Sequence, residues 1–356
     1  MKRTIAAAFA AAALLCSQAF SFDHPVMLAG QGSFAAGGTT VTTPGQYDYD
    51  HPLTTGGQTL HGDHAYVFWQ KPVNAHKYPL VFLHGAGQSG QSWETTPDGR
   101  DGFQNIFLEK GFATYIVDQP RRGRAGRSTV PETISAKPDD QLWFNNFRMG
   151  LWPDYYDNVA LSKDPKALEQ FFRQMTPNTG AYNDQVISDA MAAVFEKSGD
   201  AVLVTHSQGG GPGWLTAIKS DKVKGIIAIE PGSGFVFPEG EVPAPLETTS
   251  PFGALKGVAI PASDFAKLTR MPIVIYFGDN IPETPTNEWG LDNWRVRLQM
   301  ARLFAETINR HGGHAEVVKL PDEGLKGNTH FLFSDTNNKE VADLIARWLH
   351  KEGLDK

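Results

Sequence analysis

A serine that follows an apolar run and precedes three glycines is the feature of this sequence with the clearest chemical meaning. Ser207 comes after the β-branched stretch Ala201–Thr205 and before Gly209–Gly211. This order is typical of a buried strand that turns sharply into a helix. At such a turn the hydroxyl group points away from the sheet and lies near the first helical amides, which can stabilise an oxyanion. Ser207 is therefore predicted to be a nucleophile.

The residues around Ser207 differ in one position from the Gly-x-Ser-x-Gly pattern of serine hydrolases. Gly209 keeps the second glycine, where the helix must pass close to the strand. Thr205 replaces the first glycine, and its side chain is small enough for that place. The alternative interpretation is a solvated serine at an ordinary strand–helix turn.

A serine hydroxyl needs a base beside it, and His330 is the candidate. It stands in a loop after the predicted strand 315–320 and before the closing helix. His311 and His314 precede that strand and fall on the wrong side of the sheet. His206 is too close in sequence to fold back onto Ser207. The alternative for His330 is a loop histidine packed by neighbouring phenylalanines.

Two carboxylates could orient the imidazole of the base. Glu230 ends the apolar run 226–229, and Asp279 follows the run 273–277. Each gives the chain order serine, acid, histidine that α/β-hydrolases use, and each could instead cap a loop. The residues alone leave both assignments open.

The oxyanion needs two amide donors. Gln208 follows the nucleophile and supplies the first. The second is expected from the glycine-rich loop 84–87, where Ala86 is the preferred donor and Gly87 the alternative beside it.

The same loop matches a dinucleotide-binding pattern, Gly85-x-Gly87-x-x-Gly90. A lone match of this kind is weak, and it leaves the serine turn unexplained, so no cofactor is predicted. His61 and His64 have a spacing used by metal ligands, but no further ligand accompanies them, and no metal site is predicted.

Alternating strand and helix patterns place these residues on an α/β fold with a mostly parallel sheet covered on both faces. In such sheets reactive groups gather at the carboxyl ends of the strands. Two stretches, 128–183 and 231–268, are too long for ordinary connections and are expected to form a cap or walls over the site. Residues 65–70 are predicted to form an antiparallel edge strand. The other predicted strands are 79–83, 112–117, 201–205, 223–229, 271–277 and 315–320, and the predicted helices are 102–110, 184–197, 210–219, 288–310 and 339–350.

Residues 1–21 have the pattern of a signal peptide. Lys2 and Arg3 precede the apolar run Ile5–Leu15, and small residues follow at a spacing that suits signal peptidase. Cys16 would suit a lipoprotein anchor, but Leu15 stands where such an anchor has a small residue. We therefore expect a cleaved leader, no membrane anchor and a periplasmic or extracellular protein.

Composition narrows the remaining possibilities. Cys16 is the only cysteine, so the mature chain would fold without disulfides. A net charge of −7 argues against nucleic acid as a partner. The arginines within Arg121–Arg127 are expected to shape a loop rather than to hold an anion. Residues 22–64 are expected to form a lead-in to a single hydrolase domain, 65–356.

From about Ala65 onward the sequence resembles the α/β-hydrolase superfamily, and more closely the secreted bacterial esterases known as esterase 713-like. In that group the triad acid is a glutamate after the strand that follows the nucleophile helix, which implies Glu230. The archetype has two adjacent cysteines where this chain has Ala86–Gly87, so a disulfide-stiffened oxyanion loop is not expected. The resemblance rests on Leu83–Gly85, Asp118–Pro120 with Gly123–Gly126, Thr205–Gly210, Ile229–Gly232 and Gly327–His330.

These observations predict a secreted serine hydrolase that cleaves small-molecule carboxylic esters with Ser207, His330 and Glu230. A thioester, lactone or amide is an alternative substrate, and a non-catalytic binding protein is an alternative class. Nothing in the sequence predicts an oligomeric state. Aromatic residues of the first insertion form either cap core or a pocket for an apolar or aromatic group: Trp143, Phe144, Phe147, Trp152, Tyr155 and Tyr156.

Overall fold

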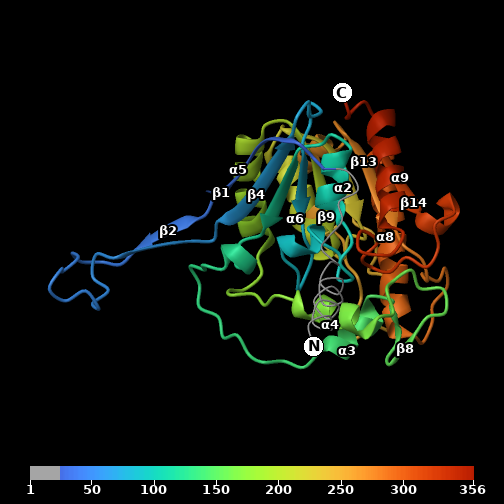
Figure 1. Ribbon diagram of the computed structural model, residues 1–356, viewed down its shortest axis with the longest axis horizontal. Coiled ribbons are helices and arrows are strands. Elements are labelled where there is room, and N and C mark those ends of the chain that lie inside the picture. The colour runs from blue at the N-terminus through green and yellow to red at the C-terminus, as the bar shows by residue number, and fades with distance from the viewer. Residues whose placement is uncertain (1–24) are drawn as a thin grey trace, which may run out of the picture.

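An eight-stranded sheet forms the centre of the computed structural model, which describes residues 25–356 (Figure 1). The predicted leader 1–21 lies outside these residues. Neighbouring strands run parallel from β6 to β14, whereas β1 and β4 pair antiparallel with each other, as do β4 and β6. In spatial order the strands are β1 Leu28–Ala36, β4 Ala65–Pro72, β6 Thr114–Asp118, β5 Leu80–Leu83, β9 Ala201–His206, β10 Val223–Ile229, β13 Pro272–Phe277 and β14 His314–Lys319. The predicted α/β class and parallel sheet are confirmed.

Burial along the strands follows from their place in the sheet. All residues of the central strands β5 and β9 are buried, because helices cover both faces of a parallel sheet. The outer strand β1 alternates between exposed and half-buried residues instead. Continuous apolar runs therefore mark the centre of the sheet, where the nucleophile strand lies.

Helices enclose the sheet in two hydrophobic layers (Figure 1). One layer contains α5 (Asp184–Ser198), α6 (Gly210–Lys219) and α8 (Trp289–Arg310). The other contains α2 (Phe103–Glu109) and α9 (Asn338–Lys351). These five helices lie within two residues of their predicted bounds.

The two long stretches that interrupt the strand–helix alternation carry short elements of their own. The first holds α3 Asp140–Asn146, β7 Gly150–Leu151, β8 Asp154–Tyr155 and α4 Pro165–Arg173. The second holds β11 Val236–Pro238, β12 Val258–Ile260 and α7 Ala262–Leu268. In Figure 1, α3 and α4 lie together at one end of the sheet, and the C-terminus lies at the other.

The N-terminal part corrects one expectation. We predicted residues 65–70 as an edge strand, but β4 is the second strand of the sheet because β1 pairs along its outer side. In the sequence between β1 and β4, β2 (Thr39–Thr42) and β3 (Thr59–Gly62) form a two-stranded arm that extends away from the body of the protein (Figure 1). Every residue of β2 is exposed. Within residues 25–356 no helix is both long and apolar enough to cross a membrane.

Candidate active site

Ser207 occupies the sharp turn between β9 and α6 that the sequence predicted. Its backbone φ is +53°, in the left-handed region that non-glycine residues rarely adopt. The chain passes through a single 3-10 turn, Ser207–Gly209, before α6 begins. Gly209 allows this close passage, since a Cβ there would meet the carbonyl oxygen of His84 at 2.7 Å. Strained backbone at such a turn is a feature of nucleophile elbows.

Thr205 fits the position of the missing glycine because a different glycine makes room for it. A Cβ on Gly213, one turn into α6, would lie 2.6 Å from the Thr205 methyl group. Strand β9 and helix α6 can therefore pack closely because the glycine at their contact lies on α6 instead of on β9.

His330 and Glu230 meet in the interior, 100 residues apart in sequence. The His330 Nδ1 lies 2.6 Å from Glu230 Oε2, and neither side chain is exposed. Within the described chain the other ring nitrogen, Nε2, makes no hydrogen bond. The carboxylate thus fixes one edge of the ring and leaves the second nitrogen available to a proton donor.

The charge of Glu230 depends on an arginine that sequence analysis missed. The fully buried Arg148 donates to both carboxylate oxygens, at 2.9 Å to Oε2 and by a second bond to Oε1. The amide of Gly278 donates to Oε1 at 2.7 Å. Burial alone would raise the pKa of Glu230, but the Arg148 charge and the His330 hydrogen bond outweigh it and lower the pKa to about 2.

The structure brings Glu230, and not Asp279, to the histidine. Asp279 Oδ2 accepts hydrogen bonds from the Gly327 amide at 2.7 Å and from Asn158 at 3.2 Å. Its own amide donates to Asn328 at 2.8 Å. Asp279 therefore holds the loop that carries His330 without contacting the imidazole.

A second carboxylate holds the same loop from inside. The buried Asp335 accepts from the Thr329 amide and hydroxyl at 2.7 and 2.8 Å, and from Asn328 at 3.1 Å. Burial raises the pKa of Asp335 to about 7, although these hydrogen bonds act in the opposite direction. Asp279 and Asp335 together hold Gly327–Thr329, the three residues that lead into His330.

Aromatic rings pack around the imidazole of His330. Phe147 stacks on it with ring centres 5.2 Å apart, and Trp294 lies 4.1 Å from it. His206 lies 4.3 Å away, and its Nε2 donates to the His330 carbonyl at 2.9 Å. Burial lowers the pKa of His330 to about 4 despite the opposing effect of Glu230, so the ring is neutral at neutral pH.

Of the other candidate histidines, His311 and His314 lie away from the site, whereas His206 lies beside His330. His206 supports the His330 backbone from β9, and His311 pairs with Glu241 at 2.9 Å. His314 begins β14, at the opposite end of that strand from the site.

Ser207 opens onto a cavity of about 250 Å³. Both predicted oxyanion donors, Ala86 and Gln208, lie in its wall. Within residues 25–356 neither of their amides donates to another protein group. Trp143 is the one of the six predicted aromatic residues of the first insertion that lines this cavity. The first insertion therefore contributes both to the hydrophobic core and to the cavity wall. The rest of the wall comes from the first insertion (Asn146), the loop after β10 (Gly232, Ser233), the second insertion (Phe252) and α8 (Asn293, Trp294, Arg297).

Buried side chains hold the peptide that carries the Ala86 amide. The Gly85 carbonyl accepts from Arg122 Nη1 at 2.9 Å and from His84 Nδ1 at 3.0 Å. In a planar trans peptide the carbonyl oxygen and the N–H point in opposite directions. The two hydrogen bonds to the Gly85 oxygen therefore also fix the direction of the Ala86 N–H. The nearby arginines have structural partners: Arg121 pairs with Asp63 and Arg124 with Asp118. The prediction that this arginine cluster shapes a loop is confirmed.

Two glycines of the dinucleotide-like pattern allow close packing against other parts of the protein. A Cβ on Gly85 would lie 2.7 Å from the Ser207 Cβ, and one on Gly90 would lie 2.7 Å from Asp118 Oδ1. The loop leads into a four-residue 3-10 helix, Gly90–Trp93, instead of the long helix that a pyrophosphate site requires.

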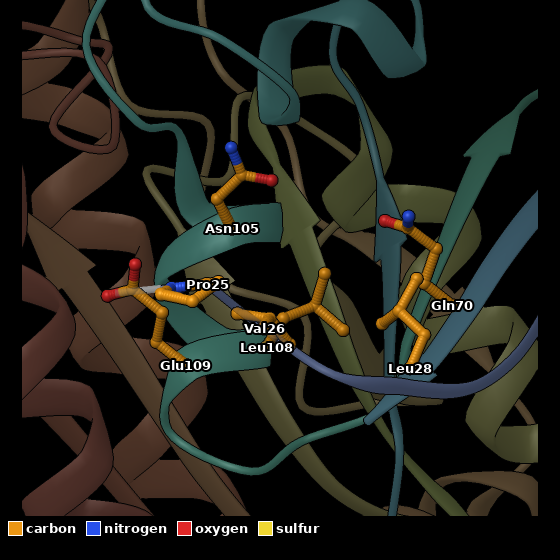
Figure 2. A pocket seen from close by; sticks show the side chains of 7 residues that line it. All are labelled: Pro25, Val26, Leu28, Gln70, Asn105, Leu108 and Glu109. Carbon is orange, nitrogen blue, oxygen red and sulfur yellow. The ribbon is translucent and has the colours of Figure 1, made fainter. Parts of the chain in front are cut away.

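A second hollow, of about 310 Å³, lies away from these residues (Figure 2). It is enclosed by the N-terminal segment at Pro25 and Val26, by β1 and β4, and by α2. Glu109 is its one ionisable lining residue among those described, so it has no nucleophile and base. The smaller cavity at Ser207 is therefore the candidate active site.

Comparison with known proteins identifies the family of the chain. The model of the alpha/beta hydrolase family matches residues 80–351. The "Probable secreted lipase phiG" of Fungal sp. (strain ATCC 74256) is 29% identical over 304 residues, which cover 77% of this chain and 82% of the relative. The solved structure of a novel bacterial esterase superposes with a TM-score of 0.74 at 29% identity, over 93% of this chain and 98% of that one. With the family model covering most of its length, the chain belongs to the α/β-hydrolase family.

Proposed function

We propose that this protein is a secreted serine hydrolase that cleaves carboxylic esters with Ser207, His330 and Glu230. The observation that carries the proposal is the buried His330–Glu230 contact of 2.6 Å, which leaves Nε2 free while Ser207 stands on a strained turn at the cavity. The names of the relatives, an esterase and a lipase, support ester chemistry.

The proposed reaction proceeds in two halves. Ser207 Oγ attacks the ester carbonyl while His330 Nε2 takes its proton, and the Ala86 and Gln208 amides stabilise the oxyanion. The carbon–oxygen bond to the alcohol then breaks, and His330 returns the proton to the leaving alkoxide. Water, deprotonated by the same nitrogen, attacks the acyl-enzyme, and release of the acid regenerates Ser207.

The aromatic walls of the cavity favour substrates with an apolar or aromatic part. Trp143, Phe252 and Trp294 come from three separate elements and face the same space. Flat apolar walls bind such groups through area and dispersion rather than through hydrogen bonds.

Secretion is the second part of the proposal. It is supported by the basic start, apolar run and small residues of the leader, and by the printed description of the fungal relative as secreted. Expression of the full chain in a bacterium with an export system should give mature protein outside the cytoplasm, whereas a variant without residues 1–21 should stay inside. Equal retention of both would contradict a signal peptide.

Hydrolysis of p-nitrophenyl esters of graded chain length tests the activity. Wild type should release p-nitrophenol, and Ser207→Ala should lose at least about a thousandfold in kcat. Ser198→Ala is the matched control, because Ser198 lies at the end of α5 and does not line the cavity. Labelling by a fluorophosphonate should follow the same order. Full activity of Ser207→Ala, or wild type that neither reacts with the probe nor hydrolyses any ester, refutes the proposal.

A further inference from the structure

Arg297 carries a positive charge that no carboxylate in the described chain balances at contact distance. The other three arginines of α8 each pair with an acidic side chain: Arg295 with Asp292, Arg302 with Glu283 and Arg310 with Glu241. Arg297 has no such partner within 4.0 Å among residues 25–356, although it lines the cavity of Ser207.

Only part of the Arg297 guanidinium is used by the protein. Its Nη1 donates to the Asn293 carbonyl at 2.7 Å and to the Asn293 side-chain oxygen at 2.5 Å. The Asn293 amide is held in turn by Asn146 at 2.8 Å, and the guanidinium lies 5.4 Å from the Trp294 ring centre. These contacts fix the side chain and leave Nε and Nη2 without a hydrogen bond in the part of the chain described.

The unused edge is one that arginine can present to a carboxylate. Nε and Nη2 lie side by side, and elsewhere in this molecule Arg121 holds Asp63 through the same two atoms, at 2.8 and 2.9 Å. Two parallel bonds of this kind match the two oxygens of a carboxylate. Arg297 offers the same pair of donors, and no acceptor among residues 25–356 occupies them.

Arg297 is half-buried at the wall of the cavity, so its charge has lost part of its hydration and would be stabilised by a bound anion. Burial lowers the pKa of Arg297 to about 10, so the guanidinium remains charged at neutral pH. A charge in such surroundings is normally paired. Arg297 lines the cavity that also contains Ser207, so a bound substrate is the natural source of the anion.

We propose that Arg297 binds a carboxylate on the substrate, so that the preferred esters carry a free acid group besides the ester that is cleaved. This inference rests on the proposed function and adds the substrate class. Half-esters of dicarboxylic acids have this chemistry: the ester lies at Ser207, the carboxylate at Arg297, and the chain between them packs against Trp143 and Phe252.

Monoethyl and diethyl esters of glutaric, adipic and pimelic acid test this assignment. They share the scissile group and differ in one negative charge. Arg297→Gln, which keeps a donor but removes the charge, should lower kcat/KM for the best monoethyl ester by about ten- to a hundredfold and change the diethyl ester by less than about threefold. Arg297→Lys should keep part of the preference. Arg302→Gln, a matched loss of charge at an exposed position further along the same helix, should change neither.

The outcomes separate this inference from the proposed function. Equal losses on both esters, or no loss on either, would overturn the role of Arg297 while leaving ester hydrolysis intact. If wild type hydrolyses no ester, the proposed function fails, and adipate binding then decides this inference. Adipate should raise the melting temperature of wild type and not that of Arg297→Gln; no rise in wild type refutes a carboxylate site. Circular dichroism of each variant confirms that it is folded.

Discussion

Replacing Arg148 by methionine should cost both stability and activity, because it leaves the buried Glu230 without its counter-charge. The two side chains share a pair of hydrogen bonds, and neither is exposed. Methionine fills most of the aliphatic volume and supplies no charge. The variant therefore isolates the electrostatic contribution of Arg148 to the acid that orients His330.

The size of the effect follows from the pKa of Glu230. That pKa lies at about 2, against 4.5 for an unperturbed glutamate, and each pKa unit is worth about 1.4 kcal/mol, which gives about 3 kcal/mol for the net effect of burial, Arg148 and His330 together. Because the folded-state value is the lower one, this stabilisation is complete above about pH 4.5 and is lost as the pH falls towards 2. Breaking a buried ion pair costs about 3–5 kcal/mol in other proteins, which agrees.

The assay is thermal unfolding at pH 7, together with ester hydrolysis. An unfolding entropy of about 2.1 cal/mol/K per residue over about 330 residues predicts a melting temperature about 4–7 °C lower for Arg148→Met. The kcat should fall by about a hundredfold or more, since the imidazole loses an ionised, fixed acid. Arg148→Lys, which keeps the charge, should lie between the variant and wild type.

A double variant supplies the test that could refute this reasoning. In Arg148→Met with Glu230→Gln both charges are gone, so the double variant should be more stable than Arg148→Met alone. If the two losses simply add, or if Arg148→Met melts with wild type, Arg148 does not act by balancing Glu230.

Three further results are expected. Because burial lowers the pKa of His330 to about 4 and only the neutral ring accepts a proton, the acid limb of the kcat/KM profile should lie near pH 4; a midpoint at 6.5 would contradict it. Glu230→Gln should lower kcat by about a hundred- to ten-thousandfold, and Asp279→Asn by far less; the reverse order in rate assays would make Asp279 the acid. Gly85→Ala should lower kcat at least about tenfold with the fold retained, since its Cβ would lie 2.7 Å from that of Ser207; unchanged kinetics would show that the loop can move aside.

The sequence predicted the frame of this molecule because its periodic segments are long and their ends are marked. Asn183 caps α5 by accepting from the Gln185 and Val186 amides, and Gly199, with φ of +76°, ends that helix. Local chemistry decides such boundaries. The predicted edge position of β4 was wrong because it depends on a distant strand. The strand that pairs with its outer side, β1, has many small residues and little alternation of apolar and polar residues in its sequence, so no local pattern marked β1 as a partner.

The candidate site was predictable where a residue's role depends on its own neighbours in sequence. Ser207 is identified by the strand before it and the glycines after it, and Glu230 by the strand it ends. The contact between Glu230 and His330 could only be inferred from resemblance, since residues alone left Asp279 equally placed. Geometry distinguishes the two carboxylates through their partners, an imidazole for one and loop amides for the other.

Arg148 and Arg297 show why charge balance cannot be worked out from sequence. The role of each arginine depends on its partner in the folded structure. Arg148 comes from an insertion 82 residues before the glutamate that it neutralises. Arg297 differs from the other arginines of α8 because no carboxylate among residues 25–356 pairs with it. Each is a basic residue of ordinary type in an ordinary segment. In a low-dielectric interior, however, a guanidinium needs an anion close by. Arg148 has that anion within the protein, and this keeps the proposed triad charged. The half-buried Arg297 has no such anion within 4.0 Å among residues 25–356, and it lines the cavity in which we propose that the substrate binds. The need of a guanidinium for a nearby anion is therefore met at Arg148 by Glu230, and at Arg297 we propose that the substrate meets it.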